Sequence, residues 1–197
     1  MKQYKKTILL LVSAVLVLTA AVGTTLAYLI AGAGPVTNTF TPTEVTTYVD
    51  EYIDNGVKNN VRIQNTGTTE AYIRAAVIVT WQDAQGNVYG KKPVEGEDYN
   101  IKWWYEDDDS TNNDSWFKGS DGFYYHKAPV KSSDEDANNC FTEVLFTACS
   151  PVPDKAPNGY SLNVEILGSG IQSKPTSVVT TEWGVTMNGV NITGKSN

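Results

Sequence analysis

The sequence predicts an all-β protein: a single-domain antiparallel β-sandwich, jelly-roll-like or immunoglobulin-like, preceded by an N-terminal signal helix. Three observations support this fold class. After residue 30 the apolar residues mostly alternate with a period of two. Runs rich in Gly, Asn, Asp and Pro separate the alternating segments, as turns do. No segment after residue 30 has the apolar pattern of an amphipathic helix of about ten residues or more.

The N-terminal segment has the three-part layout of an export signal. Three lysines precede an uncharged apolar run over 7–22, and small residues follow, with Thr25 and Ala27 at the −3 and −1 positions. We therefore expect residues 1–27 to be a signal peptide that signal peptidase cleaves near Ala27. Membrane contact would end with cleavage, and the mature chain would be extracellular, secreted or associated with the cell surface. An uncleaved anchor stays open, because apolar character continues to Ile30 and could span ~30 Å of hydrocarbon.

Composition and charge exclude several classes of function. The chain has 197 residues. Without the three N-terminal lysines it contains twelve basic and 22 acidic residues, which gives a net charge of −10. This balance argues against nucleic acid or an anionic membrane surface as a partner. One histidine and no HExxH motif exclude a zinc protease site, so we expect no enzyme activity and no cofactor, with calcium as an alternative considered below.

Two segments have the clearest strand patterns, and several weaker ones lie between turns. Residues 71–81 alternate but are apolar on both faces at one end, which predicts a central strand. Residues 160–166 place Tyr160, Leu162, Val164 and Ile166 on one face. The weaker predicted strands are 36–40, 45–49, 101–104, 123–126 and 141–146.

The C-terminal part contains a helical turn and a hairpin. Residues 175–182 begin at a proline and predict one turn of helix. Asn188-Gly189 stands between the strand-like runs 185–187 and 190–192, the strongest short-range hairpin signal. The whole of 50–197 is therefore predicted to be the β-sandwich domain. Residues 28–49 precede it as a separate segment whose strand-like stretch Val36, Thr37, Asn38, Thr39 and Phe40 is a candidate donor strand.

An acidic run offers a candidate calcium site. Asp107, Asp109 and Asp114 supply carboxylate oxygens, which suit calcium outside the cell. The run lacks the spacing of an EF-hand loop, and like-charge runs commonly stay solvated. A solvated loop is therefore the favoured prediction, with calcium binding as the alternative.

Aromatic residues crowd into the same region and have two interpretations. Trp103, Trp104, Trp116 and Tyr124 could form an exposed face that stacks on sugar rings, or they could belong to the core. Neighbouring residues on a strand face opposite sides, so we expect Trp103 and Trp104 not to be buried together.

The cysteines and the histidine add little chemistry. On a straight strand, Cys140 and Cys149 would lie ~30 Å apart, whereas a disulfide needs Cα atoms within ~7 Å. We expect no bond unless the chain turns between them. His126 follows an aromatic pair on a predicted strand, and we expect it at the surface or at a strand edge.

Several stretches resemble one known family over nearly the whole chain. They are Gly23-Thr24-Thr25-Leu26-Ala27-Tyr28, residues 36–40, the run from Val57 through Asn65-Thr66-Gly67 to Arg74, residues 121–125, residues 160–166, and Glu182-Trp183-Gly184. In this order and spacing they resemble the TasA/camelysin-type family of SipW-dependent secreted proteins of Gram-positive bacteria. The resemblance implies a jelly-roll-like sandwich outside the cell, in a family whose members polymerise into biofilm matrix fibres. The chain departs from the family at Gly32-Ala33-Gly34-Pro35, where an acidic segment is expected, and in the acidic loop 106–114.

Two functions of different classes follow from these patterns. The first is a secreted, non-catalytic structural protein of the cell surface or biofilm matrix that self-assembles by strand addition, with other copies of itself or other matrix proteins as partners. The alternative is a monomeric surface adhesin or carbohydrate-binding module that uses an exposed aromatic face.

Overall fold

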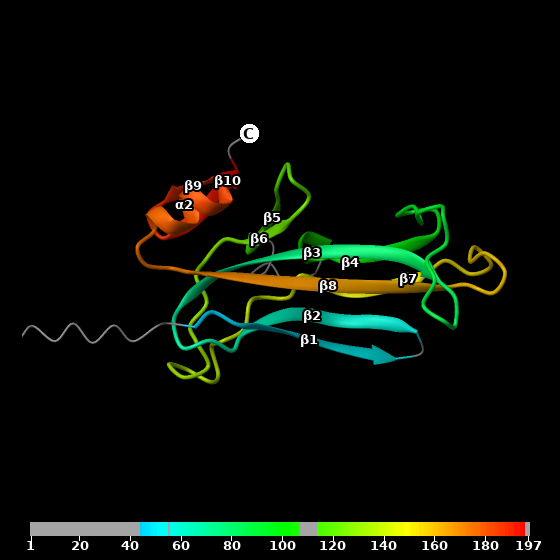
Figure 1. Cartoon of the computed structure of the whole chain (residues 1–197), viewed down its shortest axis with the longest axis horizontal. Coiled ribbons are helices and arrows are strands. Elements are labelled where there is room, and N and C mark those ends of the chain that lie inside the picture. Colours follow the sequence, from blue (N-terminus) through cyan, green and yellow to red (C-terminus); the bar gives the residue numbers. More distant parts are fainter. Residues whose placement is uncertain (1–43, 55, 107–113, 196–197) are drawn as a thin grey trace, which may run out of the picture. The chain divides into compact units, whose positions relative to one another are not determined.

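The computed structural model describes residues 44–54, 56–106 and 114–195, and these form an all-β unit (Figure 1). Its elements in chain order are β1 (Thr47–Asp54), β2 (Val57–Asn65), β3 (Ala71–Gln82), β4 (Tyr99–Trp103), the 3₁₀ helix η1 (Trp104–Glu106), β5 (Trp116–Lys118), β6 (Tyr124–His126), β7 (Phe146–Pro151), β8 (Ser161–Gln172), α2 (Ser177–Trp183), β9 (Val185–Asn188) and β10 (Asn191–Lys195). The predicted signal segment with Thr25 and Ala27, and the donor-strand candidates 36–40, lie outside the described residues. Neither helix of the described part has the length and apolar run that crossing a membrane requires.

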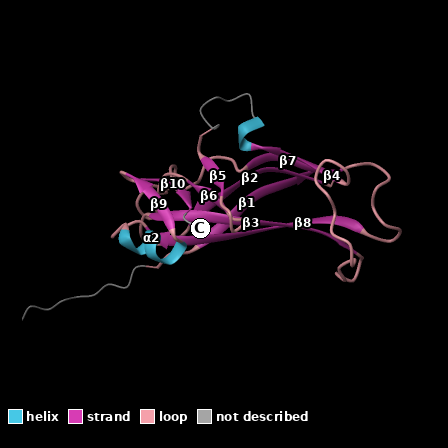
Figure 2. Cartoon of the chain, turned by 90° about the horizontal axis from the view of Figure 1, so that it is seen from above, coloured by secondary structure: helices cyan, strands magenta, loops and turns pink. Residues whose placement is uncertain are grey.

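Eight of the described strands form two four-stranded sheets with antiparallel neighbours. The first sheet has the order β1-β2-β7-β4, and the second has the order β5-β6-β3-β8. β3 and β8 pair over their full lengths, from Ala71 opposite Gln172 to Gln82 opposite Ser161, and run side by side in Figures 1 and 2. The predictions of antiparallel strands and of a central strand at 71–81 are both confirmed.

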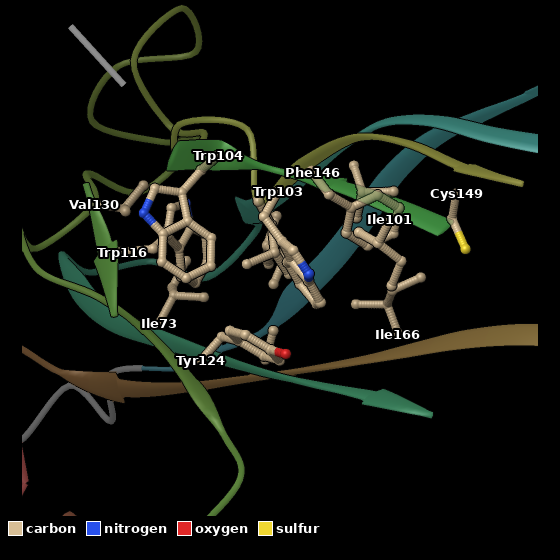
Figure 3. Close-up of a cluster of buried hydrophobic side chains, with 14 of the residues drawn as sticks. Ile73, Ile101, Trp103, Trp104, Trp116, Tyr124, Val130, Phe146, Cys149 and Ile166 are labelled. Carbon is tan, nitrogen blue, oxygen red and sulfur yellow. The ribbon is translucent and has the colours of Figure 1, made fainter. Parts of the chain in front are cut away.

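One buried cluster contains residues from both four-stranded sheets. The first sheet contributes Val61, Ile63 and Phe146, and the second contributes Ile73 and Ile166. Figure 3 shows Phe146, Ile73 and Ile166 within this cluster. These side chains come from every second position of their strands, as the alternation predicted. Each fully buried side chain of this size stabilises the fold by roughly 1.5–3 kcal/mol.

A second buried cluster covers the opposite face of β3 at its start. Tyr72 points away from the first cluster and packs with Tyr125, Trp183 and Ile192. Its hydroxyl donates a hydrogen bond of 2.7 Å to the carbonyl of Val190. The cluster therefore fastens α2 and the β9–β10 pair to the second sheet, beside the start of β3 (Figure 1).

The C-terminal predictions are confirmed with a small shift. α2 occupies seven residues, and Gly184, which follows it, takes the left-handed conformation common just beyond helix ends. β9 and β10 form the predicted hairpin, with Asn188 opposite Asn191. The two residues between them are therefore Gly189 and Val190, one position later than predicted. Gly189 supplies the positive φ of +61° that this turn needs.

The chain before β1 is also part of the unit, which corrects the predicted boundary at residue 50. β1 begins at Thr47, so that boundary falls inside a strand. Backbone hydrogen bonds of 2.9 Å hold Glu44 and Thr46 to the turn after β2, at Thr68 and Thr66. Gly67 allows this approach, since a Cβ at that position would lie 2.3 Å from the carbonyl oxygen of Glu44.

The predicted strand 141–146 is wrong in its position. β7 begins only at Phe146. Thr142 and Leu145 still donate backbone hydrogen bonds to Ile63 and Val61 of β2, at 2.8 and 2.7 Å. Two residues intervene between these contacts, so the alternation of side chains that defines a strand is interrupted here.

Candidate functional site

The four aromatic residues singled out in the sequence come together in the structure. Trp103 ends β4, Trp104 begins η1, and Trp116 and Tyr124 begin β5 and β6. These residues are only 2–6 % exposed, so the core interpretation is confirmed and the exposed aromatic face is wrong. The prediction that Trp103 and Trp104 are not buried together is wrong for a related reason. The chain leaves strand geometry after Trp103, so the two residues no longer face opposite sides of a sheet.

These four residues are among the eight that line an open pocket of about 620 Å³, which we call the aromatic pocket. Trp103 and Tyr124 stack with centroids 4.6 Å apart and planes 24° apart. Trp104 meets Trp103 nearly at a right angle, at 5.9 Å and 78° (Figure 3). The residues that line the pocket are Glu95, Trp103, Trp104, Tyr105, Trp116, Phe117, Lys118 and Tyr124.

Two charged residues of opposite sign border the aromatic pocket. The Glu95 carboxylate accepts a hydrogen bond of 2.6 Å from the indole N–H of Trp103. The Lys118 ammonium lies over the Tyr124 ring, 5.2 Å from its centroid, in a cation–π contact. The sequence did not single out either charge, because Glu95 lies in the loop before β4 and Lys118 ends a strand of three residues. Only the folded chain brings them to one pocket.

Burial raises the pKa of two tyrosine hydroxyls and one thiol near the aromatic pocket. Burial first, and the Glu95 charge second, raise the pKa of Tyr99 to about 12. The same two causes raise the pKa of the Tyr124 hydroxyl and bring the pKa of the Cys149 thiol to about 12. The aromatic pocket therefore offers neutral rings and hydroxyl groups between one carboxylate and one ammonium group.

The candidate calcium ligands are not assembled in the described part of the chain. Asp107 and Asp109 lie outside the described residues, and Asp114 forms an ion pair with Lys127. Among the residues that the structure describes, no three His, Cys, Asp or Glu side chains are grouped closely enough to hold a metal ion. The acidic loop therefore stays predicted as a solvated loop, with calcium binding as the alternative.

His126 is buried, so the prediction of a surface or edge position is wrong. It ends β6, and its ring packs edge-on against Trp116 with centroids 5.0 Å apart. Nδ1 lies 2.7 Å from the carbonyl oxygen of Ala128, and Nε2 is hydrogen-bonded to the Glu143 carboxylate. The hydrogen bond from His126 lowers the pKa of Glu143 below its ordinary value. This arrangement joins the loop before β7 to the second sheet.

The expectation that Cys140 and Cys149 do not pair is confirmed, since both are free and buried. The backbone N–H of Asn65, at the end of β2, donates to the carbonyl of Cys140. Cys149 lies opposite Lys58, near the start of the same strand. The two thiols therefore sit seven residues apart along β2, roughly 23 Å at 3.3 Å per residue.

Comparison with known proteins identifies no family for this chain. The chain matches no family model, no curated protein and no solved structure. The resemblance to the SipW-dependent secreted proteins therefore stays a prediction from the motifs alone.

Proposed function

We propose that the chain is a secreted, non-catalytic structural protein of the cell surface or extracellular matrix that joins other copies of itself by strand addition. The proposal has two parts, export and assembly. Export is supported by the signal-like layout of residues 1–27. Assembly is supported above all by one observation, the open outer edge of β1.

β1 is a long edge strand with apolar side chains exposed to solvent. Among the described strands it pairs only with β2. Tyr48, Tyr52 and Ile53 are 60 %, 58 % and 63 % exposed. An edge of eight residues offers unpaired backbone groups to an added strand, and the exposed rings offer that strand apolar contact.

The charges on β1 are largely compensated within the fold. Edge strands often resist pairing because they carry charged side chains. Here Asp50 pairs with Arg62 at 2.7 Å, and Glu51 pairs with Lys58 at 2.8 Å. An added strand would therefore meet little net charge on this edge, apart from Asp54.

The candidate donor suits such an edge. Residues 36–40 carry no charge and consist of Val, Thr, Asn and Phe, three of which favour strands. They precede β1 by only a few residues in the chain, so one copy could accept a strand on β1 while donating its own.

We further propose that the two four-stranded sheets form a jelly-roll-like sandwich. The shared cluster that includes Ile63 of the first sheet and Ile73 of the second supports this assignment. A sandwich of this kind has open edges at both sheets, which strand addition requires.

Two truncations test assembly. We compare residues 28–197 with residues 43–197, which keep β1 and its anchor at Glu44 intact. Light scattering and electron microscopy should show fibres or oligomers for the longer chain and monomers for the shorter one. A synthetic peptide of residues 34–43 should slow assembly of the longer chain.

A point variant separates the β1 edge from other surfaces. Tyr52→Lys places a charge on the edge and should reduce assembly, because lysine is a common means of blocking edge strands. Tyr89→Lys is the matched control, since Tyr89 is also exposed but lies in the loop after β3. Monomers from residues 28–197 at neutral and acidic pH, or equal assembly of both truncations, would contradict strand addition from the N-terminal segment.

A further inference from the structure

The outer face of the first sheet carries an open groove, which we call the outer groove. Arg62 lies on this face, because its two neighbours on β2 are buried in the core. Two open pockets of about 450 and 330 Å³ meet at Arg62, which lines both. The chain segment 141–144 borders the two, with Phe141 at the first pocket and Val144 at the second.

The outer groove follows β2 over about four residues. Phe141, at the first pocket, lies opposite Gln64, and the second pocket reaches Asn60. At 3.3 Å per residue this is roughly 13 Å. The groove is therefore long enough for several units of a linear polymer.

The charges that line the outer groove compensate one another. Each titratable side chain in its lining pairs with another side chain of the described fold. These pairs are Arg62–Asp50, Lys58–Glu51, His126–Glu143 and Lys131–Asp136. A charged ligand would have to compete with existing pairs, so the groove favours a polar ligand without charge.

Arg62 is a preorganised hydrogen-bond donor at the centre of the groove. Its guanidinium lies over the Phe141 ring, 4.0 Å from the centroid, and its Nε–H donates to the Asp50 carboxylate at 2.7 Å. The side chain is still 43 % exposed. Among the described residues the guanidinium forms no other hydrogen bond to a carboxylate or carbonyl. Its two terminal NH₂ groups can therefore donate to ligand oxygens without first being ordered.

Tyr52 gives the groove an accessible aromatic ring. It lines the second pocket and is 58 % exposed. Unlike the rings of the aromatic pocket, it stacks on no other ring in the described part of the chain. The C–H groups on the face of a pyranose can pack against Tyr52 while hydroxyl groups of the sugar reach Arg62.

The position of the groove favours a glycan over an extended peptide. Extended peptides bind sheets mainly through backbone hydrogen bonds at an open edge. The outer groove lies on β2, whose backbone is already paired with β1 and β7. A ligand must therefore bind to side chains, among them the amides of Asn138 and Asn139, which donate and accept. Sugar hydroxyl groups also do both.

We propose that the outer groove binds a neutral, linear glycan chain. Arg62 donates to sugar oxygens at the centre, and Tyr52 packs on a sugar ring in the second pocket. Asn138 and Asn139 bond to hydroxyl groups in the first pocket. This goes beyond strand addition, which uses the backbone edge of β1 rather than the outer face of the sheet.

Titration with neutral oligosaccharides tests binding. The purified full-length chain is titrated by calorimetry with cellohexaose, chitohexaose and mannohexaose. At least one should bind at a single site with a Kd of about 1 mM or tighter. The corresponding disaccharide should bind at least about tenfold more weakly, because it cannot occupy both pockets. No heat of binding from any of the three up to about 5 mM, or equal affinity of the disaccharide, would overturn the proposal.

Paired variants locate the site. Arg62→Lys keeps a positive charge beside Asp50 but lacks the flat guanidinium, and Tyr52→Ala removes the ring. Each should weaken binding about tenfold. Lys102→Arg and Tyr89→Ala are the controls, because both residues are exposed and neither lines the groove. Controls that lose as much affinity as the groove variants would place binding elsewhere and refute this site.

Two further probes test the class of ligand. Hexagalacturonic acid and an uncharged glycine–serine hexapeptide should both bind more weakly than the best neutral hexasaccharide. Tighter binding of either one would refute a neutral glycan. Thermal melting of every variant shows whether the fold is retained, so lost binding is not mistaken for unfolding. Failure of this proposal would leave strand addition on β1 unaffected, since assembly is measured without a glycan.

Discussion

Replacing Asn65 by Asp is a sharp test of the fold, because the two side chains have nearly the same shape. Asn65 ends β2 and is completely buried. Its amide nitrogen donates to the carbonyls of Thr69 at 2.9 Å and Val130 at 3.0 Å, and its oxygen accepts from the backbone N–H of Gly67 at 3.1 Å. An ionised Asp keeps the accepted bond and loses both donated ones.

The expected loss of stability depends on which hydrogen bonds each carbonyl still accepts in the variant. The Val130 carbonyl also accepts from the backbone N–H of Ala71 at 2.9 Å, so it stays satisfied and the lost bond costs about 1 kcal/mol. The Thr69 carbonyl loses its donor from Asn65, which adds about 1–3 kcal/mol. Asn65→Asp should therefore destabilise the domain by about 2–4 kcal/mol, and repulsion between the carboxylate and the carbonyls adds to this.

Urea unfolding followed by tryptophan fluorescence measures this difference. The midpoint of Asn65→Asp should fall while the slope stays constant, because the surface exposed on unfolding is unchanged. Asn100→Asp is the control, since Asn100 is exposed on β4 and adds a charge without burying it. A loss below about 1 kcal/mol for Asn65→Asp, or one equal to the control, would refute the reasoning.

Two further predictions concern titratable groups. The folded-state pKa of Glu143 lies below its ordinary value of 4.5, so its stabilising hydrogen bond with His126 is present above that value and is lost as pH falls through the folded-state pKa. Calorimetric melting near pH 6 should show the wild type to be about 1 kcal/mol more stable than Glu143→Gln, a modest difference because the carboxylate is half exposed. The difference in stability should vanish in acid, and a difference that stays constant with pH would contradict this prediction. Both cysteines should resist a thiol reagent in the native state, because Cys140 is fully buried and burial raises the pKa of Cys149 to about 12. After unfolding without reductant, two thiols per chain should react with the reagent. An intact mass lower by two hydrogens would instead reveal a disulfide.

The strands with regular alternation could be predicted from the sequence. β3 and β8 are long, and each has one face that contributes Ile73 or Ile166 to the core, so a period of two is visible over many residues. The β9–β10 hairpin could equally be predicted from the sequence, since glycine readily adopts the positive φ that Gly189 has in its turn. β5 has only three residues, too few to show any period.

The candidate site could be predicted only in part. The aromatic cluster in the sequence identified Trp103, Trp104, Trp116 and Tyr124, which do meet in one pocket. Their burial depends on the change from strand to 3₁₀ helix after Trp103, and no local pattern marks that change. Glu95 reaches the same pocket from a separate loop, through a contact that only the fold creates.

The attachment of residues 44–47 has a mechanical consequence. Gly168 and Gly170 of β8 leave room for Thr47 and Val45, and Gly67 leaves room for the Glu44 carbonyl. A pull on Glu44 along the axis of β1 would load the hydrogen bonds between β1 and β2 in shear, since these bonds run perpendicular to the strands. Bonds loaded in shear must break together, whereas bonds that are peeled break one after another. If neighbouring subunits attach through the chain that precedes Glu44, tension in the resulting filament would be borne by β1 in its stronger direction.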